Sequence, residues 1–212
     1  MKYTVSPPAV FRAVYPKRLW RIPTVDKVLY LTFDDGPIPE VTPWVLEQLK
    51  FFNAKATFFC IGDNVAKHPE VFQQVLSEGH RVGNHTQHHI KGWRSTLEAY
   101  LKEVRLCQLQ MLQHHSDSDS QLFRPPYGQI KSRQSKKLRD LGYQVVMWDV
   151  LSADFDTSLD AKACTKNVIE HAKPGSVIVF HDSIKAWPRL EASLPAVLKY
   201  FSEKGYEFRC IP

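Results

Sequence analysis

The chain has 212 residues, of which 43% are hydrophobic and 12% aromatic, which is typical of one globular domain and excludes a disordered chain. Its 28 basic and 22 acidic residues leave a net charge of +6; without a zinc-finger spacing or a Lys/Arg-dense tract, this excess is too small to indicate a nucleic-acid partner. The four cysteines are far apart and form no Cys-x-x-Cys pair, so they predict neither a structural zinc knuckle nor a redox motif, and we expect reduced thiols.

Residues 1–27 are expected to form an irregular segment that wraps over the body of the protein. Residues 1–21 contain five basic side chains and no acidic one, and several prolines together with Arg12 interrupt any apolar run. This pattern lacks the apolar core of a secretory signal, and no window of the chain reaches the ~18 apolar residues that a membrane helix needs. The N-terminus therefore favours the cytoplasm, and we predict no integral membrane segment.

Apolar, β-branched runs alternate with segments of helical periodicity along the rest of the chain. Strands are predicted at residues 28–33, 54–60, 81–83, 143–148, 176–180 and 206–210. Helices are predicted at residues 40–52, 69–79, 95–114, 131–141, 159–172 and 190–204, with Ser95 as a cap and a surface loop at 115–121. The alternation predicts an α/β fold of parallel strands in one domain, residues 28–212.

Polar residues stand where several of these strands end. The apolar run 28–33 stops at Asp34 and Asp35, and Gly36 and Pro37 then turn the chain, which taken alone is equally consistent with a solvated turn. Polar residues follow the later strands at His85 to His89, at Arg124, at Asp149 to Asp154, and at His181 with Asp182. Because the reactive groups of such folds lie at the carboxyl ends of the parallel strands, we expect these residues to meet at one end of the domain.

A metal site is the first chemistry that these residues predict. His85 and His89 are four residues apart, and one helical turn would place both on the same face, with His88 as an alternative. Two histidines and one carboxylate make a hydrolytic, zinc-type ligand set, and Asp35 is the carboxylate candidate. The side chain of Asp34 diverges from that of its neighbour, so Asp34 is a candidate base toward a water whose pKa a metal lowers.

Three further positions complete this predicted site. Arg124 offers a cation that would keep Asp34 ionised and oriented. Gly128, with the backbone of Tyr127, is placed to supply an oxyanion donor at a tight turn. His181 is placed for a general acid, since it stands at a strand end beside another titratable residue.

Four sequence motifs, taken together, resemble those of the polysaccharide deacetylases, which are the NodB-homology or carbohydrate esterase family 4 enzymes. In chain order they are Thr32-Phe33-Asp34-Asp35-Gly36-Pro37, His85-Thr86-x-x-His89, Arg124-x-Pro126-Tyr127-Gly128 and Phe180-His181-Asp182. The resemblance runs from about residue 28 to about residue 211 and implies a distorted (β/α) barrel of about seven parallel strands. It also implies a divalent metal, usually zinc and sometimes cobalt or nickel, and the removal of acetyl groups from N-acetylglucosamine polymers or acetylated xylan.

The resemblance implies a role for each matching position. These roles are a general base at Asp34, metal ligands at Asp35, His85 and His89, a tether for the base at Arg124, an oxyanion donor at the Tyr127 amide, and a general acid at His181.

One motif departs from the family pattern Asp-x-x-Asp-Trp, because this chain has Leu151 and Phe155 at its two ends. The second Asp of the pattern is kept as Asp154, which is expected to pair with Arg124 or His181. The residues expected to line the substrate pocket are Phe155, Val179 and Pro126.

We therefore predict a metal-dependent enzyme that hydrolyses the acetamide of an N-acetylglucosamine-containing glycan, such as peptidoglycan or a chitin-like oligosaccharide. Because of the altered motif, an alternative function remains, that of a glycan-binding module that has the fold without the activity. A second alternative is a deacetylase of a small or lipid-linked acetylated sugar. The N-terminus supports it because it lacks the pattern of a secretory signal, whereas polymeric cell-wall glycan lies outside the cytoplasm. A monomer is expected. The compartment stays open, because the activity favours the cell envelope and the N-terminus does not.

Overall fold

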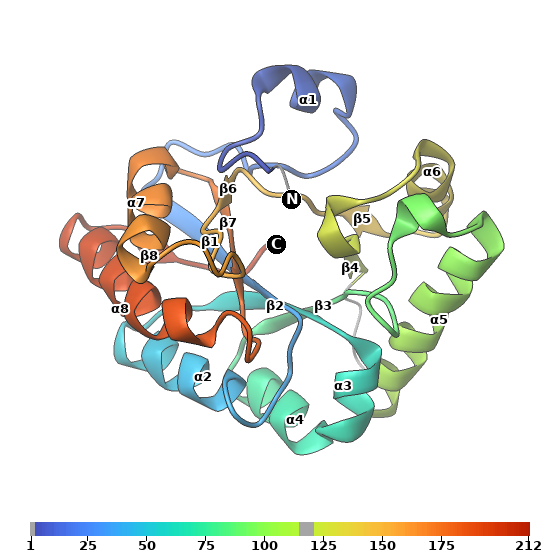
Figure 1. The fold of residues 1–212 in the computed structure, drawn as a ribbon, viewed down its shortest axis with the longest axis horizontal. Coiled ribbons are helices and arrows are strands. Elements are labelled where there is room, and N and C mark those ends of the chain that lie inside the picture. The colour runs from blue at the N-terminus through green and yellow to red at the C-terminus, as the bar shows by residue number, and fades with distance from the viewer. Residues whose placement is uncertain (1–2, 115–120) are drawn as a thin grey trace.

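Parallel strands form a curled sheet, and most of the helices lie around its outside (Figure 1). The structure, a computed structural model, describes residues 3–114 and 121–212. Its strands are β1 (Val28–Asp34), β2 (Ala56–Cys60), β3 (Arg81–Asn84), β4 (Leu122–Phe123), β5 (Gln144–Val145), β6 (Val150–Leu151), β7 (Val177–His181) and β8 (Glu207–Phe208). Its helices are α1 (Ala9–Val14), α2 (Thr42–Phe51), α3 (Gly62–Lys67), α4 (Pro69–Ser77), α5 (Leu97–His114), α6 (Ser132–Asp140), α7 (Ala161–His171) and α8 (Trp187–Glu203), with the short 3-10 helices η1 (Gly92–Arg94) and η2 (Pro126–Gly128). This arrangement confirms the predicted distorted (β/α) barrel in one α/β domain.

The central strand β1 and its neighbours are aligned so that their polar residues lie at the same edge of the sheet. The strands follow the order β5-β4-β3-β2-β1-β7-β6, and β8 pairs with the start of β1. The parallel register places Asp34 of β1 beside His181 of β7 and beside Phe59 of β2. It also places Cys60 of β2 beside Asn84 of β3. Because these parallel strands end in step, the residues that follow β1, β3 and β7 meet at one edge of the sheet.

All seven residues of β1 are buried, which explains why its sequence is a nearly continuous apolar run rather than an alternating one. Inside the sheet, the Phe33 ring stacks with Phe58 and Phe180 at centroid distances of 5.0 and 6.1 Å. Burying a side chain of this size stabilises the fold by about 1.5–3 kcal/mol. The residue after Phe33 is Asp34, so the base candidate stands on a closely packed part of the core.

The sheet is open between β5 and β6. The strand predicted at 143–148 is observed as the shorter β5, and the separate strand β6 was not predicted. β5 pairs with β4 at one edge of the sheet, whereas β6 pairs with β7 at the other edge. A buried apolar run has no periodicity that could mark this change of partner. The N-terminal segment fills the opening: Met147 N–H donates to the Leu19 carbonyl at 2.7 Å, and Leu151 N–H donates to the Val5 carbonyl at 2.8 Å.

Local boundaries differ from the prediction in a few places. The helix α3 was not predicted, because its first residue, Gly62, reads as a break after the preceding strand. Ser95 does not cap α5; the Thr96 hydroxyl oxygen accepts from Ala99 N–H at 3.2 Å instead, and the Ser95 hydroxyl donates to the Lys91 carbonyl. The predicted loop at 115–121 lies, except for its last residue, outside the described residues. Within the described part of the chain, no helix is long and apolar enough to cross a membrane.

Candidate metal centre and active site

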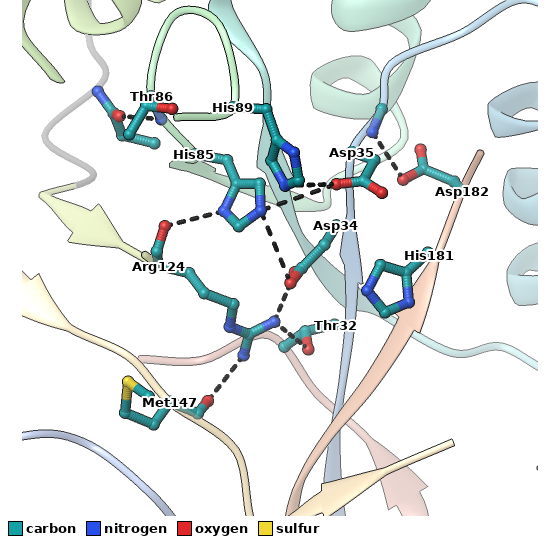
Figure 2. Close-up of polar contacts among 12 residues, drawn as sticks. Thr32, Asp34, Asp35, His85, Thr86, His89, Arg124, Met147, His181 and Asp182 are labelled. Atoms are coloured by element: carbon teal, nitrogen blue, oxygen red, sulfur yellow. Dashed lines mark hydrogen bonds and ion pairs between the residues drawn. The ribbon is translucent and has the colours of Figure 1, made fainter. Parts of the chain in front are cut away.

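The two adjacent carboxylates at the end of β1 have different neighbours. Asp34 is the last residue of the strand and is buried, whereas Asp35 follows it with a φ of 85°. This left-handed conformation is uncommon outside glycine, and it turns the chain directly after the strand. Figure 2 shows Asp34 facing Arg124, while Asp35 lies beside His89. The backbone therefore gives each carboxylate its own set of contacts.

Asp35 and two histidines form a cluster suited to a metal ion. Asp35 Oδ1 lies 3.2 Å from His89 Nε2 and 3.8 Å from His85 Nε2. Figure 2 marks both contacts with dashed lines. One ligand atom from each of the three side chains lies within 4.8 Å of the others. His88, the alternative ligand, is outside the cluster: its ring is exposed and its Nδ1 lies 3.1 Å from Glu103 Oε1.

The prediction that His85 and His89 lie on one helical turn was wrong. β3 ends at Asn84, residues 85–90 form no helix, and Thr86 and His89 have φ values of 67° and 53°. Asn84 Oδ1 accepts a hydrogen bond from Thr86 N–H at 2.9 Å and stabilises this tight loop. The two imidazole rings come to a centroid distance of 5.0 Å. The loop therefore brings the two imidazoles together, although it forms no helix.

The protonation of these side chains fits a divalent cation. His85 Nδ1 donates to the Arg124 carbonyl at 2.8 Å, so its Nε2 presents a lone pair to the cluster. Burial lowers the pKa of His85 to about 4 and also lowers that of His89, so both imidazoles are neutral near pH 7. Asp35 Oδ1 is buried and accepts no hydrogen bond from the described residues. Two neutral nitrogens and one unpartnered carboxylate oxygen make the donor set of hydrolytic zinc sites.

Asp34 is held by a fully buried arginine. Arg124 Nη1 donates to Asp34 Oδ1 and to Thr32 Oγ1, each at 2.7 Å, and its Nη2 donates to the Met147 carbonyl at 2.9 Å (Figure 2). Burial alone would raise the pKa of Asp34, but the charge and hydrogen bond of Arg124 outweigh it and lower that pKa. Asp34 Oδ2 lies 4.0 Å from His85 Nε2, which places the other carboxylate oxygen toward the metal cluster.

His181 is paired with Asp154. Of the two partners predicted for Asp154, Arg124 and His181, the structure shows His181. His181 Nδ1 donates to Asp154 Oδ1, and the His181 backbone N–H donates to Asp154 Oδ2, both at 2.8 Å. Burial lowers the pKa of His181, but the charge and hydrogen bond of Asp154 raise it to about 9. The imidazole is therefore protonated near pH 7, and its Nε2–H is the proton that a substrate could take.

Asp149 was expected in this cluster and is not part of it. Its Oδ1 accepts from Arg12 Nη1 at 2.5 Å, and its Oδ2 accepts from the Ser176 hydroxyl at 2.6 Å. Ser176 precedes β7, whereas His181 ends that strand, so Asp149 lies at the opposite end of the sheet. Its role is to bind the N-terminal segment.

Asp182, in contrast, holds the turn that carries the metal-ligand candidate. Its Oδ1 accepts from Gly36 N–H at 3.0 Å, and its Oδ2 accepts from the Thr42 hydroxyl at 2.6 Å. A Cβ at position 36 would lie 1.9 Å from Asp182 Oδ2. Only glycine therefore lets the chain after Asp35 approach this carboxylate so closely.

The site opens to solvent through one pocket of about 490 Å³. The predicted residues that line it are Asp34, Asp35, His85, His89, Tyr127, Phe155, Val179 and His181. Arg124 and Asp154 are buried behind this lining, and Pro126, a predicted pocket residue, is buried and does not line it. Tyr3, Trp148 and Lys185 also line the pocket. None of these three was predicted, and no sequence signal marks Tyr3, which lies far along the chain from every motif.

Tyr127 stands at the rim of the pocket beside the histidines. Its φ of 58° places it in the left-handed region, within η2. The Tyr127 ring lies 4.5 Å, between centroids, from His89, and the Lys91 ammonium lies 4.9 Å from the Tyr127 ring centroid. The turn therefore puts the ring of Tyr127 next to His89, one of the metal-ligand candidates.

Comparison with known proteins finds a family and several relatives. A family model described as polysaccharide deacetylase matches residues 21–146. A peptidoglycan-N-acetylglucosamine deacetylase of Bacillus cereus is 33% identical over 190 residues, which cover 89% of this chain and 88% of the relative. The peptidoglycan-N-acetylmuramic acid deacetylase PdaC of Bacillus subtilis is 32% identical, over 87% of this chain and 38% of the relative. The crystal structure of the Bc1960 peptidoglycan N-acetylglucosamine deacetylase, in complex with 4-naphthalen-1-yl-N-oxidanyl-benzamide, matches with a TM-score of 0.88 and 30% identity, covering 95% of this chain and 94% of that chain.

Proposed function

This chain belongs to the polysaccharide deacetylase family, and we propose that it is a metal-dependent hydrolase that removes the acetyl group from N-acetylglucosamine residues of a glycan. The relatives named above act on peptidoglycan, and we infer a peptidoglycan-type or related glycan as the substrate. The observation that carries this proposal is the separation of the two carboxylates: Asp34 is bound by Arg124, whereas Asp35 is left for a cation.

We assign Asp35, His85 and His89 as the residues that hold the cation, and zinc as the ion that best suits one carboxylate and two neutral imidazoles. When bound, such an ion polarises the acetamide carbonyl and lowers the pKa of water at the site. Family membership supports a divalent metal in general, and the choice of zinc over cobalt or nickel is part of the proposal.

The side chains of this protein then divide the proton transfers between them. Asp34, kept ionised by Arg124, accepts the proton of the attacking water through its Oδ2. The Tyr127 amide is assigned to stabilise the oxyanion that forms on the carbonyl oxygen when water attacks the carbonyl carbon. His181, held as an imidazolium by Asp154, donates its Nε2 proton to the nitrogen as the C–N bond breaks. Acetamide and water thus become acetate and a free amine.

The test is acetate release by the zinc- or cobalt-loaded protein from N-acetylglucosamine oligosaccharides and from acetylated peptidoglycan. Asp34→Asn should lose at least about a hundredfold in turnover, the contribution expected of a general base, and should keep its metal. No acetate from any of these glycans, with the metal shown to be bound, would overturn the proposed activity. An Asp34→Asn protein that remains active would overturn only the choice of base.

We also expect a monomer, which size-exclusion chromatography with light scattering would check. The contact between His181 and Asp154 supports an active enzyme over a binding module without activity, because the altered fourth motif still positions the acid candidate.

A further inference from the structure

One wall of the pocket comes from the N-terminal segment. The Tyr3 ring packs edge-on against Phe155, with 5.3 Å between centroids, and Phe155 packs edge-on against His181 at 5.2 Å. The Tyr3 hydroxyl donates to Asp156 Oδ2 at 2.6 Å. All four side chains line the pocket. His181, the acid candidate, is therefore in contact with an aromatic wall of the pocket, and Tyr3 is part of that wall.

Two contacts hold the N-terminal segment in place against the sheet. The Val5 carbonyl accepts from Leu151 N–H, which extends the edge of β6 by one more hydrogen bond at 2.8 Å. Farther along the segment, Arg12 pairs with the buried carboxylate of Asp149. Together with the Tyr3–Asp156 bond, these contacts place the Tyr3 ring independently of any substrate.

Lys185 adds a positive charge at the same wall. Its ammonium lies 5.9 Å from the Phe155 ring centroid. It is the one lysine or arginine that lines the pocket among the described residues, and no carboxylate of that part of the chain lies within ion-pair distance of it. Asp156, the nearby acidic side chain of this wall, is occupied: its two oxygens accept from Tyr3 and from Ser158. Lys185 is thus available to a negative group on a ligand.

The chemistry of the site says which part of a substrate this wall would meet. The acetyl carbonyl must lie toward Asp35, His85 and His89, whereas the nitrogen must lie toward His181, which supplies its proton. The nitrogen is attached to the sugar ring. Groups that pack on the far side of His181 therefore face the sugar and its neighbour in the glycan. Aromatic side chains with one polar edge, such as Tyr3, suit a ligand surface that is partly apolar and partly hydroxylated.

From the proposed function, on which this inference rests, we propose that Tyr3, Phe155 and Lys185 form a sugar-binding subsite that takes a pyranose bearing a carboxylate. The aromatic pair packs on the sugar ring, and Lys185 pairs with the carboxylate. The expected substrate is accordingly an acidic glycan, in which the deacetylated residue or its neighbour carries a carboxyl group, in preference to a neutral one.

The experiment measures binding in the zinc-loaded Asp34→Asn protein by titration calorimetry, so that turnover does not intervene. The probes are N,N′-diacetylchitobiose, which is neutral, and the disaccharide of N-acetylglucosamine and N-acetylmuramic acid, which carries a lactyl carboxylate. Tyr3→Ala should weaken both ligands by about fivefold, the effect expected for losing one aromatic contact. Lys185→Gln should weaken binding of the acidic disaccharide by about threefold and binding of the neutral one by less, because an exposed ion pair contributes only modestly to affinity. Added salt should reproduce the effect of Lys185→Gln.

Matched controls separate the subsite from general stability. Tyr15→Ala removes another tyrosine of the same segment, one that packs with Arg18 and does not line the pocket, and Lys50→Gln removes an exposed lysine of α2. Neither control should change either affinity. The inference fails if Tyr3→Ala leaves both affinities unchanged, or if Lys185→Gln weakens the two ligands equally. Because binding is measured without turnover, a protein that binds in this pattern yet releases no acetate would refute the proposed activity and leave the subsite standing.

Discussion

Asp154→Asn tests the assignment of His181 as the acid, because the change keeps a hydrogen-bond acceptor beside His181 Nδ1 and removes the charge. The pKa of His181 is about 9 in this structure against an ordinary value of 6.5. At 1.36 kcal/mol for each pH unit, this difference corresponds to about 3 kcal/mol in favour of the imidazolium. The His181 side chain is only 14% exposed, so solvent does not screen the pair strongly. Without the charge of Asp154, burial still lowers the pKa and the carboxylates of Asp35 and Asp34 still raise it, so the pKa should fall toward the ordinary 6.5.

The effect on turnover follows from the fraction of His181 that carries the proton. At pH 8, about 90% of the imidazole is protonated with a pKa of 9 and about 3% with a pKa of 6.5, so the rate should fall about thirtyfold. At pH 6 both proteins are mostly protonated, and their rates should differ little. A bound cation would lower both pKa values, so the quantity to measure is the difference between the two proteins.

The assay is acetate release as a function of pH from 5 to 10, in roughly half-unit steps, with kcat and kcat/KM determined at each pH. The alkaline limb of kcat should move downward by about two pH units in Asp154→Asn. Asp160→Asn is the control: it removes a nearby charge and keeps an acceptor for Ala163 N–H at the start of α7. An alkaline limb that stays in place in Asp154→Asn, or a loss of rate that is the same at every pH, would refute the assignment of His181 as an acid poised by Asp154.

Two further predictions concern the buried base and the metal ligands. Arg124→Met should lower the free energy of unfolding, measured with urea near pH 7, by about 3–5 kcal/mol, because it leaves the buried carboxylate of Asp34 without its partner; a change below 1 kcal/mol would contradict the buried pair. His85→Gln should weaken zinc binding at least about tenfold in a competition assay with a chelating dye, whereas His88→Gln should not, and equal losses in both would contradict the assigned ligand set.

Much of the chemistry could be predicted from short stretches of the chain. The apolar run before Asp34 predicts a buried parallel strand, and a carboxylate pair at its end is costly for the fold unless partners are present. Alternating strand and helix patterns predict the α/β barrel, and the order of parallel strands sends the polar residues to one edge. These inferences succeed because strand pattern, turn residues and side-chain chemistry are properties of neighbouring residues.

Other parts of the site depend on contacts that no local pattern encodes. The approach of His85 to His89 results from a loop with left-handed residues, not from the helix that their spacing suggested. The choice of His181 over Arg124 as the partner of Asp154, and the exclusion of Asp149, follow from the pairing of β6 with β7.

Two adjacent carboxylates, two histidines, an arginine and a late histidine could be placed at strand ends from the order of residues alone, and these residue types predict a metal-dependent hydrolase. The folded arrangement sets which atoms face one another: Asp34 pairs with the buried guanidinium, and Asp35 keeps an unpartnered oxygen beside two neutral imidazoles. It alone brought Tyr3 to the pocket. Side-chain type and spacing are local properties, whereas burial, pKa and the choice of partner depend on packing between segments that are distant in the chain.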